Sequence, residues 1–127
     1  MFSHIVLGAQ NVDASKNFYD AALGALGIAP GAVNAERVIY ATPSGMLMIT
    51  APIDGKPATH ANGGTVGFAA TSPEQVEAWH AAGVAAGGTT CENPPGVRDL
   101  GAGNKLYLAY LRDPAGNKLC AMHRMAA

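Results

Sequence analysis

The sequence predicts an α+β domain in which two tandem βαβββ modules form an open barrel around a cavity. Each half of the chain shows the hydrophobic pattern of one strand, one helix and then three strands. The two halves also align with each other at a nearly constant offset, which indicates an internal repeat. We expect module 1 at about residues 1–52, a linker at about 53–62 and module 2 at about 63–127, within one domain of 127 residues.

The first module opens with an apolar strand over residues 2–9. A helix is expected over about residues 13–26, because apolar residues recur there at every fourth position. Asn11 or Asp13 can cap the start of this helix, and Gly27 is placed to stop it. Three strands follow, near residues 28–33, 36–42 and 46–51, the last two joined by the turn Pro43-Ser44-Gly45.

The second module begins with a strand over residues 65–69. A strong helix start follows, in which Ser72 is the N-cap, Pro73 occupies the first helical position and Gln75 completes a capping box. The glycine pair at 87–88 ends this helix. Three further strands are expected, at residues 89–92, 105–112 and 117–124.

The repeat can be stated as an alignment of residues. Equivalent residues of the two modules differ by 61 in residue number over the first strand and the helix of each module. This offset aligns Ile5 with Val66 in the strands, Phe18 with Trp79 on the helices and Gly27 with Gly88 at the helix ends. An offset of 71 aligns the hairpin turns at Pro43 and Pro114, and we assign the ten extra residues to a loop at 93–104. The alternative fold, a ferredoxin-like βαββαβ sandwich, has one strand after the second helix where this sequence predicts three.

The amino-acid composition argues against two classes of binding partner. Charged residues make up only 13% of the chain and the net charge is −1, so neither nucleic acid nor a membrane surface is an expected partner. With 49% hydrophobic residues, part of the exterior should be apolar, and a homodimer interface would cover it. Cys91 and Cys120 are far apart, and we find neither a signal peptide nor an apolar run of membrane-spanning length, so a cytoplasmic location is expected.

Three motifs resemble one family. Ser3-His4-Ile5 opens the chain, Asn17-Phe18-Tyr19-Asp20 lies in the first helix, and residues 113–118 have the sequence Asp-Pro-Ala-Gly-Asn-Lys. Together they are similar to the vicinal-oxygen-chelate superfamily, which includes glyoxalases, bleomycin-resistance proteins and extradiol dioxygenases. The resemblance implies paired modules around a pseudo-twofold axis and a small-molecule ligand in the cavity between them.

Glyoxalase-like members hold a divalent metal with four inward-facing ligands. The resemblance implies that the four ligand positions in this chain are His4, Ile49, Thr65 and Cys120. Ile49 has no donor atom, and Thr65 offers only a neutral hydroxyl, which is a poor ligand for zinc, nickel or iron. No cofactor is therefore expected, and a divalent metal held through His4 and Cys120 is the alternative.

His4 and Cys120 are the candidate catalytic residues. His4 on the first strand can act as a base or proton shuttle near neutral pH, or can be satisfied within the barrel. Cys120 lies on the last strand, where an adjacent imidazole would favour a nucleophilic thiolate. The alternative for Cys120 is a buried, inert thiol.

Four residues are candidates for substrate binding. Arg98 lies in a glycine-rich loop that could form a lid, and can pair with a ligand anion or remain a solvated charge. Met48 alternates with apolar neighbours and can line the cavity wall or the core. Tyr107 and Tyr110 are three residues apart on one strand, so they face opposite sides and one of them should reach the cavity.

Three functions remain open at this point. The first is a glyoxalase-like protein that binds a small apolar or aromatic molecule, with lyase or isomerase activity that uses His4 as the base. The second is a non-catalytic protein that sequesters its ligand, as bleomycin-resistance proteins do. The third is a metal-dependent lyase or dioxygenase with a reduced ligand set. Fold analogy alone does not choose among them, because one scaffold supports many reactions.

Overall fold

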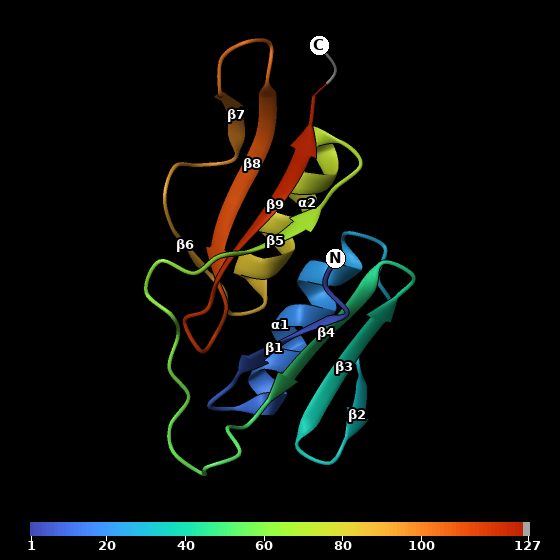
Figure 1. The fold of residues 1–127 in the computed structure, drawn as a ribbon, viewed down its shortest axis with the longest axis vertical. Helices are drawn as coiled ribbons and strands as arrows, with labels where there is room; N and C mark the ends of the chain where they lie inside the picture. The colour runs from blue at the N-terminus through green and yellow to red at the C-terminus, as the bar shows by residue number, and fades with distance from the viewer. Residues whose placement is uncertain (126–127) are drawn as a thin grey trace.

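A computed structural model describes residues 1–125 and contains two sheets and two helices (Figure 1). The elements in chain order are β1 (His4–Gly8), α1 (Val12–Gly24), β2 (Ala32–Asn34), β3 (Arg37–Thr42), β4 (Gly45–Thr50), β5 (Val66–Ala69), α2 (Pro73–Ala85), β6 (Thr89–Thr90), β7 (Gly96–Asp99), β8 (Lys105–Arg112) and β9 (Lys118–Arg124).

The two sheets repeat one topology. The first has the strand order β1-β4-β3-β2 and the second has β5-β9-β8-β6, with β7 also paired to β8. In each sheet the opening strand runs parallel to the closing strand of the hairpin, β1 beside β4 and β5 beside β9. The predicted α+β fold class is confirmed. Within residues 1–125 the sheets stay open around the helices and form no closed barrel.

Both helices begin at the predicted caps. The backbone amide of Ala14 donates to Asn11, and that of Gln75 donates to Ser72. The Gln75 side chain accepts from the amide of Thr71, one residue before the predicted partner. Helix α1 ends at Gly24, two residues earlier than predicted, because the next amides bond in tight turns that lead into Gly27, whose φ is 83°.

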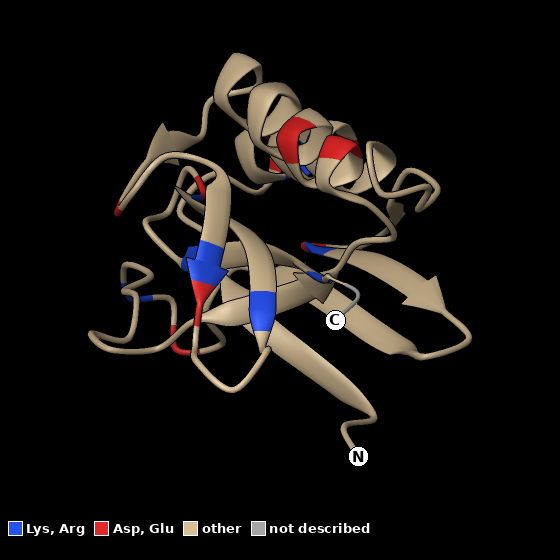
Figure 2. Ribbon diagram, turned by 90° about the horizontal axis from the view of Figure 1, so that it is seen from above, with Lys and Arg blue, Asp and Glu red and all other residues tan. Residues whose placement is uncertain are grey.

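The two helices pack against each other and join the modules into one core. Phe18 of α1 and Trp79 of α2 are fully buried. Gly83 allows the close approach, since a Cβ atom at this position would lie 2.4 Å from Leu111 and 3.1 Å from Phe18. Figure 2 shows the helices together on one side of the sheets and the charged residues widely scattered.

The segment predicted as a loop at 93–104 contains an additional strand. Gly96–Asp99 pairs with Lys105–Leu108 of β8 in an antiparallel hairpin. The second module therefore has four strands after its helix, and the loop prediction was wrong there. Prolines before it and glycines after it hid a strand of only four residues.

A buried polar network connects the second hairpin to the first module. Asp113, only 3% exposed, accepts a hydrogen bond of 2.5 Å from the Tyr19 hydroxyl of α1 and one of 2.8 Å from the Asn117 side chain. Asn117 also donates to the carbonyl of Gly8 at the end of β1. Burial, and then the negative charge of Asp113, raise the pKa of Tyr19 well above its ordinary value, so its hydroxyl remains a donor.

Candidate functional site

A pocket of about 500 Å³ lies at the junction of the two modules. The beginning of β1, the β3–β4 turn and the end of α1 supply its walls from module 1, and β5 supplies the wall from module 2. The apolar part of the lining comes chiefly from Phe2, Leu23, Leu26, Ile28, Met46 and Phe68. The pocket is open to solvent on one side and has the size of a small-ligand site.

The polar groups of the pocket come from one edge of the first sheet. Ser3 precedes β1 and His4 begins it, while Thr42 ends β3 and Ser44 lies in the turn that follows. The Ser3 hydroxyl and His4 Nδ1 are 2.8 Å apart, and the Thr42 and Ser44 hydroxyls are 3.0 Å apart. Nε2 of His4 makes no hydrogen bond within residues 1–125, so it is available to a ligand.

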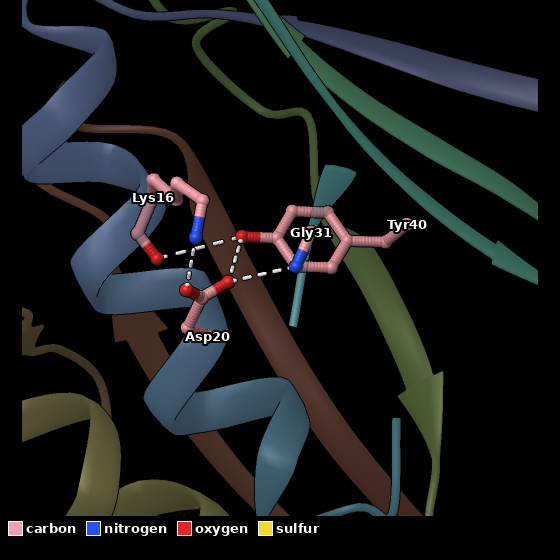
Figure 3. A network of polar contacts seen from close by, with 4 residues as sticks. All are labelled: Lys16, Asp20, Gly31 and Tyr40. Carbon is pink, nitrogen blue, oxygen red and sulfur yellow. Dashed lines mark hydrogen bonds and ion pairs between the residues drawn. The ribbon is translucent and has the colours of Figure 1, made fainter. Parts of the chain in front are cut away.

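Tyr40 forms part of the pocket wall, and its orientation is fixed from behind by α1 (Figure 3). Its hydroxyl donates to Asp20 at 2.8 Å, and the same carboxylate accepts from Lys16 and from the amide of Gly31. Burial and the Asp20 hydrogen bond raise the pKa of Tyr40 far above its ordinary value. Tyr40 is therefore a neutral, fixed wall residue at physiological pH.

Strand register corrects one of the predicted inward positions. Ile5 pairs with Leu47 in the first sheet and Val66 pairs with Leu119 in the second, which sets the offset at the closing strands to 72 and not 71. Met48 is therefore the equivalent of Cys120. Ile49 is fully buried beneath α1, so its predicted inward position was wrong. One extra residue in the second hairpin turn explains the error, since side chains alternate between faces.

The family's metal positions do not suit a divalent cation in this chain. With the corrected register they are His4, Met48, Thr65 and Cys120. A thioether and a neutral hydroxyl are weak ligands for zinc, nickel, iron or manganese. Within residues 1–125 no group of three or more His, Cys, Asp or Glu side chains is close enough to hold a metal ion. No metal-dependent step is derived for this site.

Cys120 lies on the open face of the second sheet and outside the lining of the junction pocket. It is paired with Gly67 and Tyr110, and a Cβ atom at Gly67 would lie 3.2 Å from its sulfur. Burial raises the pKa of this thiol, and Lys118 offsets only part of that effect. The thiol is protonated at neutral pH, which is its less reactive form.

The other predicted binding residues are spread over the molecule. Met48 lies beside Val6 on the open face of the first sheet, and Met46 takes the place in the pocket lining. Arg98 lies on β7, not in the predicted loop, and donates to the carbonyls of Asn93 and Pro94 just before that strand. None of the four predicted binding residues contributes to the junction pocket.

The two tyrosines of β8 face opposite sides. The Tyr107 hydroxyl donates to Glu77 on α2 at 2.9 Å, so Tyr107 lies on the helix side of the sheet. Tyr110 lies on the open face, with the Lys118 ammonium 5.2 Å from its ring centre. Tyr110 is thus a neighbour of Cys120, not of His4.

Sequence reasoning identified His4 but missed the rest of the pocket. Phe2, Leu26, Ile28 and Phe68 each occupied positions that a core also explains. The hydroxyls of Thr42 and Ser44 lay in an ordinary turn. Their common location depends on how the modules pack, and no spacing in the sequence reports it.

Comparison with known proteins agrees with this architecture. The model of the Glyoxalase/Bleomycin resistance protein/Dioxygenase superfamily matches residues 1–121. A crystal structure of a glyoxalase/bleomycin resistance protein from Albidiferax ferrireducens T118 is 64% identical, with a TM-score of 0.94, and the match covers 98% of this chain and 99% of that one. None of the curated proteins matches the chain.

Two more distant structures share the fold. A glyoxalase-related enzyme from Fulvimarina pelagi is 20% identical, with a TM-score of 0.72 over 96% of this chain and 86% of that one. Lactoylglutathione lyase from Agrobacterium tumefaciens is 21% identical, with a TM-score of 0.63 over 96% and 92%. Across residues 1–125, no helix has the length and apolar character needed to cross a membrane.

Proposed function

Because this chain belongs to the glyoxalase/bleomycin resistance protein/dioxygenase superfamily, we propose that it binds a small organic molecule in the junction pocket and acts on it as a lyase or isomerase. The observation that carries the proposal is the location of His4, with Nε2 free, in the lining of a largely apolar pocket. This is the one predicted catalytic residue that reaches a pocket of ligand size.

The chemistry follows from the ring nitrogens of His4. When Nδ1–H donates to the Ser3 hydroxyl, the lone pair on Nε2 is free to accept a proton. Nε2 would remove a proton from the carbon beside a ligand carbonyl and return it to a neighbouring atom, which isomerises the ligand without a net change in protons. The hydroxyls of Thr42 and Ser44 in the same lining are hydrogen-bond partners for the carbonyl oxygen.

Deuterium exchange tests this role. The protein is incubated in D₂O with 2-hydroxyacetophenone, and loss of the proton signal beside the carbonyl is followed by NMR. We expect exchange above the buffer rate with the native protein and about 100-fold less with His4→Gln, a typical effect of losing a general base. His80→Gln, on α2 and outside the pocket lining, is the matched control and should retain exchange. Equal exchange with His4→Gln would refute the catalytic role.

Sequestration without turnover is the second candidate. This function is favoured by the family's four metal-ligand positions, two of which hold the weak ligands Met48 and Thr65 in this chain. In this case the native protein binds 2-hydroxyacetophenone stoichiometrically, and exchange stays at the buffer rate. The same experiment therefore separates the two functions.

We also propose that two copies associate through the open face of the first sheet. Apolar side chains occupy this face, including Val6 at 47% exposure and its neighbour Met48, and they would meet the same apolar residues of a second copy across a twofold axis. Light scattering should give a dimer for the native protein and for Val84→Glu on α2, but a monomer for Val6→Glu. A monomeric native protein would reject the dimer.

A further inference from the structure

The junction pocket contains no Lys, Arg, Asp or Glu side chain among the described residues that line it. Apolar side chains from both modules make up most of the lining. The hydrogen-bonding side chains Ser3, His4, Thr42 and Ser44 gather at one end of the first sheet. The lining is thus divided into an apolar body and one polar end.

From this division we infer that the natural ligand class is uncharged: a compact aromatic or branched aliphatic body with one hydroxyl or carbonyl group at the His4 edge. The inference rests on the proposed function, because it names the ligand of the same pocket. Its physical basis is desolvation. A carboxylate or ammonium entering the pocket loses water and meets no Lys, Arg, Asp or Glu side chain in the lining, whereas a hydroxyl can be hydrogen-bonded by His4 or Ser3.

The ion pair behind Tyr40 is not part of the lining. The Asp20 carboxylate is bonded to Lys16, Tyr40 and the Gly31 amide, and neither Asp20 nor Lys16 lines the pocket. Tyr40, which does line it, contacts this carboxylate through its hydroxyl (Figure 3). The pair is therefore neither a counter-ion for a cationic ligand nor, through Lys16, one for an anionic ligand.

Three probes with one apolar body and different charges test the inference: 2-naphthylmethanol, 2-naphthoate and 2-naphthylmethylammonium. Calorimetric titration at pH 8 with the native full-length chain gives the three dissociation constants. We expect the alcohol to bind at least about tenfold more tightly than either ion. The benzyl series, with a smaller body, is titrated in parallel and should give the same order.

A matched pair of variants checks the location. Ser44→Lys adds a cation at the polar edge of the pocket, while Thr59→Lys adds one at an exposed residue of the linker outside it. Ser44→Lys should improve naphthoate binding relative to the alcohol by up to about fivefold, the range of an exposed ion pair. Thr59→Lys should leave that ratio unchanged.

The outcomes separate the two proposals. Binding of either ion as tightly as the alcohol overturns the uncharged ligand class and leaves the pocket in place as the binding site. Equal effects of Ser44→Lys and Thr59→Lys show that the probes bind elsewhere and overturn the inference. Failure of all probes in both series to bind overturns the proposed binding function, and the ligand class with it.

Discussion

At the residue scale, the side chains that shape the site are held by contacts behind it. Asp20 shows this most clearly (Figure 3). Burial opposes ionisation of its carboxyl group, but hydrogen bonds from Lys16, Gly31 and Tyr40 outweigh burial and hold the pKa below the ordinary value. The ionised carboxylate thereby fixes the ring that forms the pocket wall.

The lowered pKa predicts how stability depends on pH. The contribution of Asp20 is complete above the unfolded-state pKa of about 3.9 and is lost as the pH falls through the lower folded-state pKa. We expect Asp20→Asn to lower the free energy of unfolding at pH 7, and the difference from the native protein to shrink at pH 3. Urea unfolding at both pH values measures it, with Asp54→Asn in the exposed linker as the control. A difference independent of pH would contradict the assignment.

Residue-scale prediction from sequence succeeded where one residue type has one role. Ser72 was identified as a cap, and Asn11 as one of two candidates with Asp13, because a side-chain oxygen there can accept from a helix amide. Ile49 was assigned to the wrong face of its strand. The face on which a side chain lies depends on the strand register, and a one-residue change in turn length moves each aligned position to the opposite face.

At the element scale, the contact between the helices depends on Gly83. We expect Gly83→Ala to destabilise the protein by about 1–3 kcal/mol, because the new methyl group would lie too close to Leu111 and Phe18. Gly24→Ala is the matched control, since a Cβ atom there meets nothing within 4 Å in a helical conformation. It should be neutral or stabilise by up to about 1 kcal/mol. Equal thermal shifts for both variants would show that the helices are not this close.

Elements with a clear period were predictable from sequence, and short ones were not. Helices α1 and α2 and the hairpin of β8 and β9 carry long apolar patterns and strong turn signals. Strand β7 has only four residues, the first of them Gly96, and is specified by pairing with β8, a tertiary contact that leaves no local pattern.

At the scale of the whole molecule, the modules are joined by the Asp113 network as well as by the helices. Asn117→Ala removes a donor to the buried carboxylate and to the Gly8 carbonyl. Unsatisfied buried acceptors should lower the free energy of unfolding by about 2–3 kcal/mol in chemical denaturation. Asn62→Ala, at an exposed linker residue, should have no such effect. A similarly small change in both variants would mean that the network does not hold the modules together.

The junction pocket is a property of this module packing. The internal repeat allowed the fold to be predicted because it extends along the whole chain, and three short motifs allowed the family to be predicted. The pocket combines Phe2 with Ile28 and Phe68, which are far apart in sequence and meet only where the modules join. Cys120 and Tyr110 were plausible from their strand positions and Arg98 from a glycine-rich loop, yet all three lie outside the pocket lining.

The methionine methyl groups distinguish the two faces on which a ligand could bind. Met46 lines the junction pocket, whereas Met122 shares the open face of the second sheet with Cys120. A ¹³C-methyl methionine NMR titration with 2-naphthylmethanol therefore tests the location of the site directly. We expect a saturable shift of the Met46 methyl signal with Met122 unchanged. A shift of Met122 with Met46 unchanged would contradict it and place the ligand beside Cys120.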